Sequence, residues 1–221
     1  MKKVSKRKLV TEEEAQQERF AERYFNKSRK IISKYFQDID SLPGAPKELE
    51  YFKDILQKIY IDNKLIRYKK NEKFVTSFCA MVPQEIIRAA GARPLTMCST
   101  SFVEIPLSNE SVPISICPLV RSLAENIRLG LNAPIKESDI FIVPLACDCK
   151  KVLAKEAVTQ KPTFSMQIPF NRFDDDGMNL YVDQLKNVAK EISKTIKKAT
   201  PKTSFGENRI VKGIRKILWW N

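Results

Sequence analysis

Short apolar runs alternate with helical patterns between residues 74 and 198, and this alternation limits the chain to few folds. Residues 140–143 are continuously apolar, as expected of a strand buried on both faces of a parallel sheet. The predicted strands are 74–78, 94–98, 114–117, 140–143 and 163–168, and the predicted helices are 83–90, 118–130, 148–157 and 178–198. This order predicts an α/β fold: a parallel, Rossmann-like sheet flanked by helices and joined by right-handed crossovers.

Apolar residues at helical spacing mark the faces that these helices should bury. The helix over 118–130 is expected to bury Leu119 and Leu123, and the helix over 178–198 is expected to bury Leu180 and Leu185. The tetrapeptide 174–177 (DDDG) before the second of these helices is predicted to be a turn.

The segments outside the sheet divide the chain further. Residues 1–10 form a basic, aperiodic arm, and residues 11–72 form a helical segment with predicted helices at 11–38 and 46–60. These two helices cover the core or make an oligomer contact. The α/β domain takes residues 73–200, and residues 201–221 form a basic amphipathic tail. The apolar face of the tail is expected to fold back on the sheet, to dock on another subunit or to lie on an anionic membrane.

Charge and hydropathy indicate which partners and which cellular location the chain can have. The formal net charge of +13 suits an anionic partner, but no nucleic-acid-reading motif is recognisable, so nucleic acid is not expected as the partner. No run of about 18 apolar residues predicts a membrane span. The basic N-terminus lacks the apolar region of a secretory signal, so we expect a cytoplasmic protein.

Residue usage narrows the possible chemistry as well. The absence of histidine excludes Ser-His-Asp and Cys-His catalysis and every metal site that needs imidazole. The odd count of five cysteines in a cytoplasmic chain favours metal binding, redox use or burial over a disulfide framework.

Three cysteines share one local context. Cys79, Cys117 and Cys147 each end a short apolar run, expected to be a strand, and each precedes a helix-start signal. The carboxyl ends of parallel strands line one crevice, and the positive end of the following helix favours a thiolate there. Three thiolates at one crevice suit a soft metal or an iron–sulfur cluster. Cys149 is either a fourth ligand or a spare thiol, and Cys98 is expected to pack in the core.

Four ordered segments resemble the 2-hydroxyacyl-CoA dehydratase D-component family, which includes benzoyl-CoA reductase subunits and double-cubane cluster proteins. Residues 79–94 (CAMVPQEIIRAAGARP) resemble the opening motif of its first α/β domain. Residues 117–122 (CPLVRS) and 144–151 (PLACDCKK) are similar to its second and third cysteine motifs, and 161–169 (KPTFSMQIP) to the strand that closes the domain. The resemblance covers residues 72–198, and the family usually carries a second α/β domain after the first.

The resemblance implies a four-iron four-sulfur cluster held by Cys79, Cys117 and Cys147, with a double-cubane cluster as an alternative. It implies an ATP-dependent activator iron–sulfur protein as electron donor, and a second dehydratase subunit or a homodimer. The implied activity is radical dehydration or reduction of an acyl-CoA thioester, as a subunit of a (R)-2-hydroxyacyl-CoA dehydratase (a lyase) or of a related acyl-CoA reductase. The alternative is a non-catalytic electron-transfer or assembly partner that carries the cluster.

Other side chains near the cysteines are weaker candidates. Glu85 is either a first-turn acid that stabilises its helix or a proton donor beside the substrate. Ser99 and Ser101 can donate to a thioester oxygen or are plain loop residues. Arg121 lies in the first turn of its predicted helix, where a cation suggests a carboxylate or a ligand anion nearby.

Overall fold

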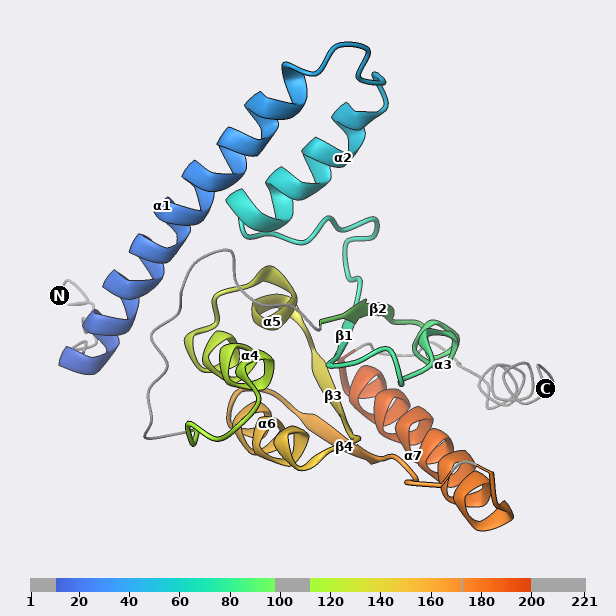
Figure 1. Ribbon diagram of the computed structural model, residues 1–221. Coiled ribbons are helices and arrows are strands. Elements are labelled where there is room, and N and C mark those ends of the chain that lie inside the picture. Colours follow the sequence, from blue (N-terminus) through green and yellow to red (C-terminus); the bar gives the residue numbers. More distant parts are fainter. Residues whose placement is uncertain (1–10, 98–111, 172, 200–221) are drawn as a thin grey trace, which may run out of the picture.

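A four-stranded parallel sheet of order β2-β1-β3-β4 lies at the centre of the computed structural model, which describes residues 11–97, 112–171 and 173–199 (Figure 1). The strands are β1 (Phe74–Ser77), β2 (Arg93–Thr96), β3 (Ile140–Leu145) and β4 (Thr163–Gln167). All three pairings are parallel. The predicted α/β class and parallel sheet are therefore confirmed.

Helices cover both faces of the sheet (Figure 1). One face carries α3 (Gln84–Ala89) and α7 (Asp175–Ala199), and the other carries α4 (Pro118–Leu129) and α6 (Asp148–Gln160). The chain leaves β1 toward one face and leaves β3 toward the other. The strand order therefore reverses between β1 and β3, which is where open α/β sheets bind their ligands.

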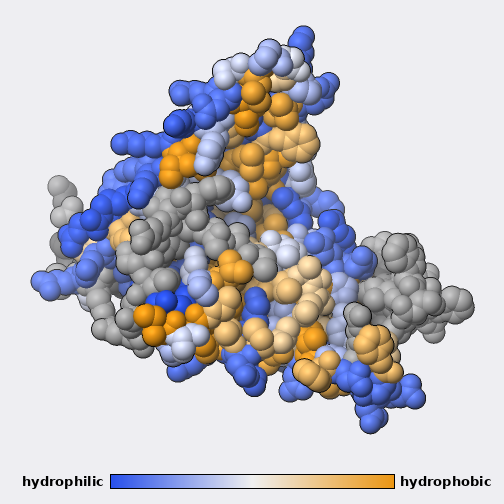
Figure 2. Space-filling view, viewed as in Figure 1, coloured by the Kyte–Doolittle hydropathy of each residue, from blue (hydrophilic) through white to orange (hydrophobic). Residues whose placement is uncertain are grey.

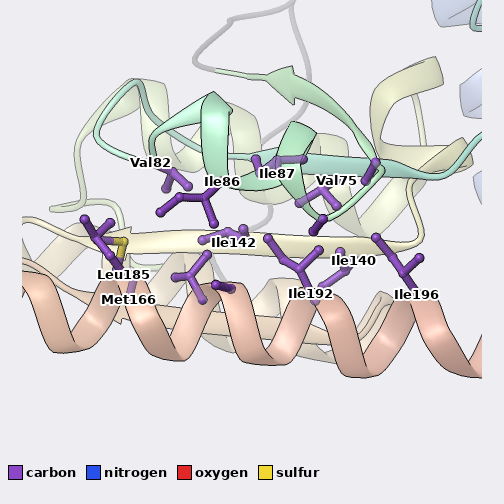
Figure 3. Close-up of a cluster of buried hydrophobic side chains, with 14 residues drawn as sticks. Val75, Val82, Ile86, Ile87, Ile140, Ile142, Met166, Leu185, Ile192 and Ile196 are labelled. Atoms are coloured by element: carbon purple, nitrogen blue, oxygen red, sulfur yellow. The ribbon is translucent and has the colours of Figure 1, made fainter. Parts of the chain in front are cut away.

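The alternation of side chains along β3 explains why this strand is apolar throughout. Ile140 and Ile142 face α3 and α7, where they pack with Leu185 and Ile192 (Figure 3). Phe141 and Val143 point to the opposite face and pack under α4 and α6. Helices cover both faces of this strand, so none of its side chains needs to be polar to face solvent.

Several predicted details of the α/β domain are wrong. Residues 114–117 do not form a strand: they lie in a turn in which the Ile116 amide donates to the Pro113 carbonyl, and Ile114 is exposed. Leu119 and Leu180 are exposed, because the buried face of α4 runs through Val120 and Leu123 and that of α7 runs through Leu185 and Ile192. The DDDG tetrapeptide also belongs mostly to α7, with Asp174 just before its first residue. A short helix, α5 (Ala133–Glu137), precedes β3 and was not predicted.

The N-terminal segment forms a helical hairpin beside the sheet domain (Figure 1). It consists of α1 (Glu12–Asp40), α2 (Leu49–Leu56) and a π-helical turn η1 (Gln57–Ile61) that continues α2. Tyr24 of α1 packs against Leu131, which follows α4. Helix α2 buries none of its residues, and Tyr51 and Phe52 are exposed. Figure 2 shows apolar side chains on this hairpin and over part of the sheet domain.

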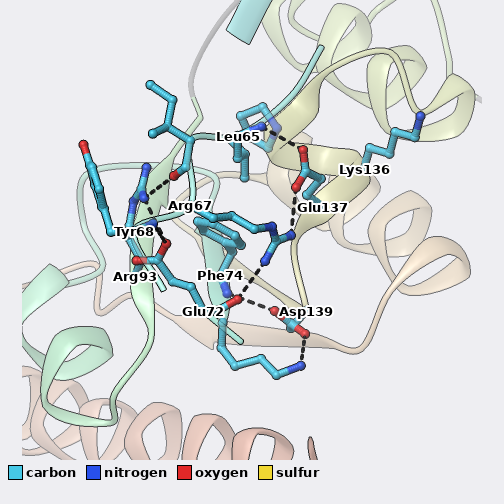
Figure 4. Close-up of polar contacts among 12 residues, drawn as sticks. Leu65, Arg67, Tyr68, Glu72, Phe74, Arg93, Lys136, Glu137 and Asp139 are labelled. Atoms are coloured by element: carbon cyan, nitrogen blue, oxygen red, sulfur yellow. Dashed lines mark hydrogen bonds and ion pairs between the residues drawn. The ribbon is translucent and has the colours of Figure 1, made fainter. Parts of the chain in front are cut away.

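Ion pairs and hydrogen bonds connect the segment that follows the hairpin to the amino ends of the strands (Figure 4). Glu137 accepts from the Leu65 amide at 2.7 Å and from the Arg67 guanidinium at 2.8 Å. Asp139 accepts from the Phe74 amide at 2.9 Å and from the Lys73 ammonium at 2.8 Å. These carboxylates hold the incoming chain at the edge of the sheet opposite to the cysteines.

The predicted arm (1–10) and the whole of the predicted tail (201–221) lie outside the described residues, as do Cys98, Ser99 and Ser101. Among the helices that are described, none has both the length and the apolarity needed to cross a membrane.

Candidate functional site

Two of the three cysteines of the shared pattern lie just beyond strand ends at the carboxyl edge of the sheet, and the third begins a helix. Cys79 lies two residues beyond the end of β1, and Cys147 lies two residues beyond the end of the neighbouring strand β3. Cys117 is the N-cap residue of α4, and Cys147 is the N-cap residue of α6. The structure therefore places two of the thiols at the point where the strand order reverses, and the third at the start of an adjoining helix.

The packing of α4 against α6 brings Cys117 and Cys149 to one hydrophobic cluster. Both are half-buried, as is Cys79, whereas Cys147 is exposed. All four described cysteines are free thiols. Cys149 stands in the first turn of α6, two residues after Cys147, so it faces the α4–α6 core rather than open solvent.

A side-chain hydrogen bond holds the chain just before Cys79. The register pairs Ser77 with Ile142, and the Phe78 amide donates to the Ile142 carbonyl at 2.9 Å. The next donor in a parallel ladder would be the amide of residue 144, but Pro144 has none. The Lys150 ammonium donates to the Phe78 carbonyl at 2.7 Å instead. Lys150 therefore supplies, at the Phe78 carbonyl just before Cys79, the hydrogen bond that Pro144 cannot donate.

A second hydrogen bond holds the Cys79 turn from the opposite face of the sheet. The Tyr181 hydroxyl of α7 donates to the Met81 carbonyl at 3.2 Å. Partial burial raises the pKa of the Tyr181 phenol, so the hydroxyl keeps its proton at neutral pH and remains a donor. The turn between β1 and α3 is therefore tied to α6 through Lys150 and to α7 through Tyr181.

The donor set can be compared with what a metal centre needs. Free thiols are the ligands that iron–sulfur clusters take, so the chemistry of these side chains fits such a cluster. Within the described ranges, however, no three Cys, Asp or Glu side chains lie close enough together to hold a metal ion. The fold brings the thiols to one edge of the sheet without assembling them into a closed ligand set.

The weaker candidates occupy surface or flanking positions. Glu85 is exposed in the first turn of α3, and Arg121 is half-buried in the first turn of α4. Asp148, next to Cys147, pairs with Lys151 at 2.7 Å, and this contact lowers the pKa of the carboxyl group. Both members of this pair are exposed, so it adds little to the site.

An apolar pocket opens at the same edge, between the Cys79 turn and the start of α7. Its volume is about 720 Å³. Its walls include Met81, Ile168, Phe170, Phe173, Met178 and Tyr181. Gly177 lets the segment after β4 fold over α7, because a Cβ atom at this position would lie 1.9 Å from the Asn171 carbonyl oxygen. Sequence reasoning missed this pocket, although the apolar residues within 169–173 lie outside any predicted strand or helix.

Part of the chain is similar to known proteins. The family model described as "2-hydroxyglutaryl-CoA dehydratase, D-component" matches residues 79–215, more than half of the chain, and the match begins at Cys79. A protein of Escherichia coli (strain K12), YjiM, whose name describes it as a dehydratase subunit, is 30% identical over 118 residues. That alignment covers 53% of this chain and 31% of the relative, so the chain spans about a third of the length of the curated relative it matches.

Proposed function

The chain belongs to the family of the 2-hydroxyglutaryl-CoA dehydratase D-component, and from this premise we propose that it is an iron–sulfur subunit of a 2-hydroxyacyl-CoA dehydratase. In the proposed reaction the thioester loses its 2-hydroxyl group and one proton from carbon 3, so that water leaves and a 2-enoyl thioester remains. The observation that carries the proposal is the placement of Cys79 and Cys147 beyond neighbouring strands, with Cys117 at the start of α4.

We propose that Cys79, Cys117 and Cys147 hold a four-iron four-sulfur cluster. When bound, the cluster supplies the low-potential electron that such a dehydration uses and recovers. The protein's part is to position the thiols: Lys150 and Tyr181 tie the Cys79 turn to α6 and α7. Because the thiols are not gathered into a closed set, cluster loading should draw the starts of α4 and α6 toward the Cys79 turn.

The proposed partners follow from the same premise. A D-component works with a second dehydratase subunit, and an ATP-dependent activator protein would deliver the electron. The net charge of +13 suits both the CoA phosphates and an acidic protein surface. The second subunit would contribute to the site that holds CoA.

Iron and sulfide analysis of protein purified without oxygen tests the cluster. We expect about four irons per chain, as one such cluster contains. Cys79→Ser, Cys117→Ser and Cys147→Ser should each lower the iron content sharply, because a three-thiolate site has no redundancy. Cys98→Ser is the matched control and should keep its iron.

Two results would contradict the proposal at different points. If the wild-type protein takes up neither iron nor sulfide under reconstitution, the proposed cluster is refuted. A Cys98→Ser variant that loses as much iron as Cys117→Ser would keep the cluster but overturn the ligand assignment.

A further inference from the structure

The apolar pocket stands beside the proposed cluster ligands. Met81 in its wall is two residues from Cys79, and two residues of chain span at most about 7 Å. The opposite wall begins with Ile168, just beyond β4. Strand β3, which leads to Cys147, lies between β1 and β4. A substrate whose reacting end lies at the thiols can therefore extend its other end into this pocket.

The lining determines what the pocket can hold. Its volume of about 720 Å³ falls within the ordinary range for small-molecule sites, about 300 to 1,000 Å³. Phe170 is fully exposed, Phe173 is 84% exposed, and Met178 is partly exposed beside them. Leaving large apolar side chains in water is unfavourable, so an apolar group that covers them gains free energy.

The charges around the pocket disfavour an anionic group. The amino end of α7 would normally attract an anion, but the protein fills that position itself: Asp174 accepts from the Gly177 amide at 2.6 Å. Asp175 and Asp176 occupy the first turn of the same helix. Residues 169–178 (PFNRFDDDGM) contain one arginine and three aspartates, so the segment has a formal charge of 1 − 3 = −2. The described lining residues include no lysine or arginine that would pair with a carboxylate.

We propose that this pocket holds the acyl chain of the thioester, and that this chain is uncharged and apolar, with room for a phenyl ring. The proposal rests on the proposed function and adds the substrate class to it. A 2-hydroxyacyl chain that ends in a carboxylate, such as 2-hydroxyglutaryl, is therefore rejected by this subunit. Apolar side chains of aromatic or branched aliphatic hydroxy acids are accepted.

Direct binding to the full-length chain tests the acyl pocket without the CoA moiety. The probes are two N-acetylcysteamine thioesters, 3-phenylpropionyl and glutaryl, with dissociation constants from ligand-detected NMR titration. The phenylpropionyl thioester should bind at least about tenfold more tightly than the glutaryl thioester. Phe173→Asp should weaken phenylpropionyl binding about tenfold or more. Phe52→Asp, the same change at an exposed phenylalanine of α2, is the matched control and should leave binding unchanged.

A variant that gains affinity for one thioester tests the pocket independently, because a misfolded variant would lose affinity for both. Met178→Arg places a cation in the wall and should raise the affinity for the glutaryl thioester while it lowers the affinity for the phenylpropionyl thioester. The proposal is overturned if neither thioester binds, if both bind equally, or if Phe173→Asp binds as well as Phe52→Asp. The iron content of the same preparations separates the two hypotheses. If the preparations contain iron but do not bind the phenylpropionyl thioester selectively, only the acyl-pocket proposal is refuted. If they bind it selectively but contain no iron, only the cluster proposal is refuted.

Discussion

Replacing Lys150 by methionine removes the donor that compensates for Pro144. The methionine keeps much of the apolar stem but leaves the Phe78 carbonyl without its 2.7 Å partner at the end of β1. Hydrogen bonds from charged groups contribute about 1.5 to 3 kcal/mol. Lys150 is half-buried, so we expect a loss of about 2 kcal/mol in the free energy of unfolding.

Thermal and urea unfolding would measure this loss. For a chain of this size, about 2 kcal/mol corresponds to a melting temperature lower by about 4 to 8 °C. The neighbouring variant Lys151→Met is the control, because Lys151 pairs only on the surface with Asp148 and solvent screens that pair. We expect nearly unchanged stability for the control. Equal effects of the two substitutions would refute the assigned role of Lys150.

A double-mutant cycle tests the reason behind the prediction. Pro144→Ala restores the amide that the ladder lacks, so Lys150→Met should cost less in that background than in the wild type. Strictly additive losses would show that Pro144 and Lys150 do not share the Phe78 carbonyl. Lys150→Met should also retain less iron than Lys151→Met if the hydrogen bond positions Cys79.

Three further changes probe the frame around the site. Glu137→Ala should cost about 1 to 3 kcal/mol in urea unfolding, because it leaves the Leu65 amide without its acceptor and Arg67 without its carboxylate partner. Leu185→Ala should cost about 2 to 5 kcal/mol by the same assay, since Leu185 is fully buried between α7 and the sheet. Gly130→Ala should cost about 1 kcal/mol, because its φ of 61° is left-handed while the space around it is open.

The cysteine pattern shows how far the site could be predicted. Cys79 and Cys147 follow strands as expected, because buried parallel strands are recognisable as short apolar runs before helix-start residues. Cys117 was expected to end a strand as well, but the run before it forms a turn. Two isoleucines around a serine are too short a run to distinguish a buried strand from a turn, and the structure leaves Ile114 exposed.

The sequence by itself determined the class of the fold. Alternating apolar runs and helices leave few arrangements other than a parallel sheet with two helical layers, because each strand must bury both faces. It also determined the family, since the ordered cysteine motifs are local strings of residues. These properties depend on neighbours along the chain, and periodicity and spacing record them directly.

Only the tertiary structure decided how distant segments meet at the site. The order β2-β1-β3-β4 places Cys79 and Cys147 just beyond the ends of adjacent strands, and this order depends on which face each crossover takes. Lys150 can donate to the Phe78 carbonyl because the register places Pro144, which has no amide hydrogen, opposite that carbonyl. Tyr181 reaches Met81 across 100 residues of sequence. Contacts of this kind arise from packing and register, so local periodicity and spacing carry no record of them.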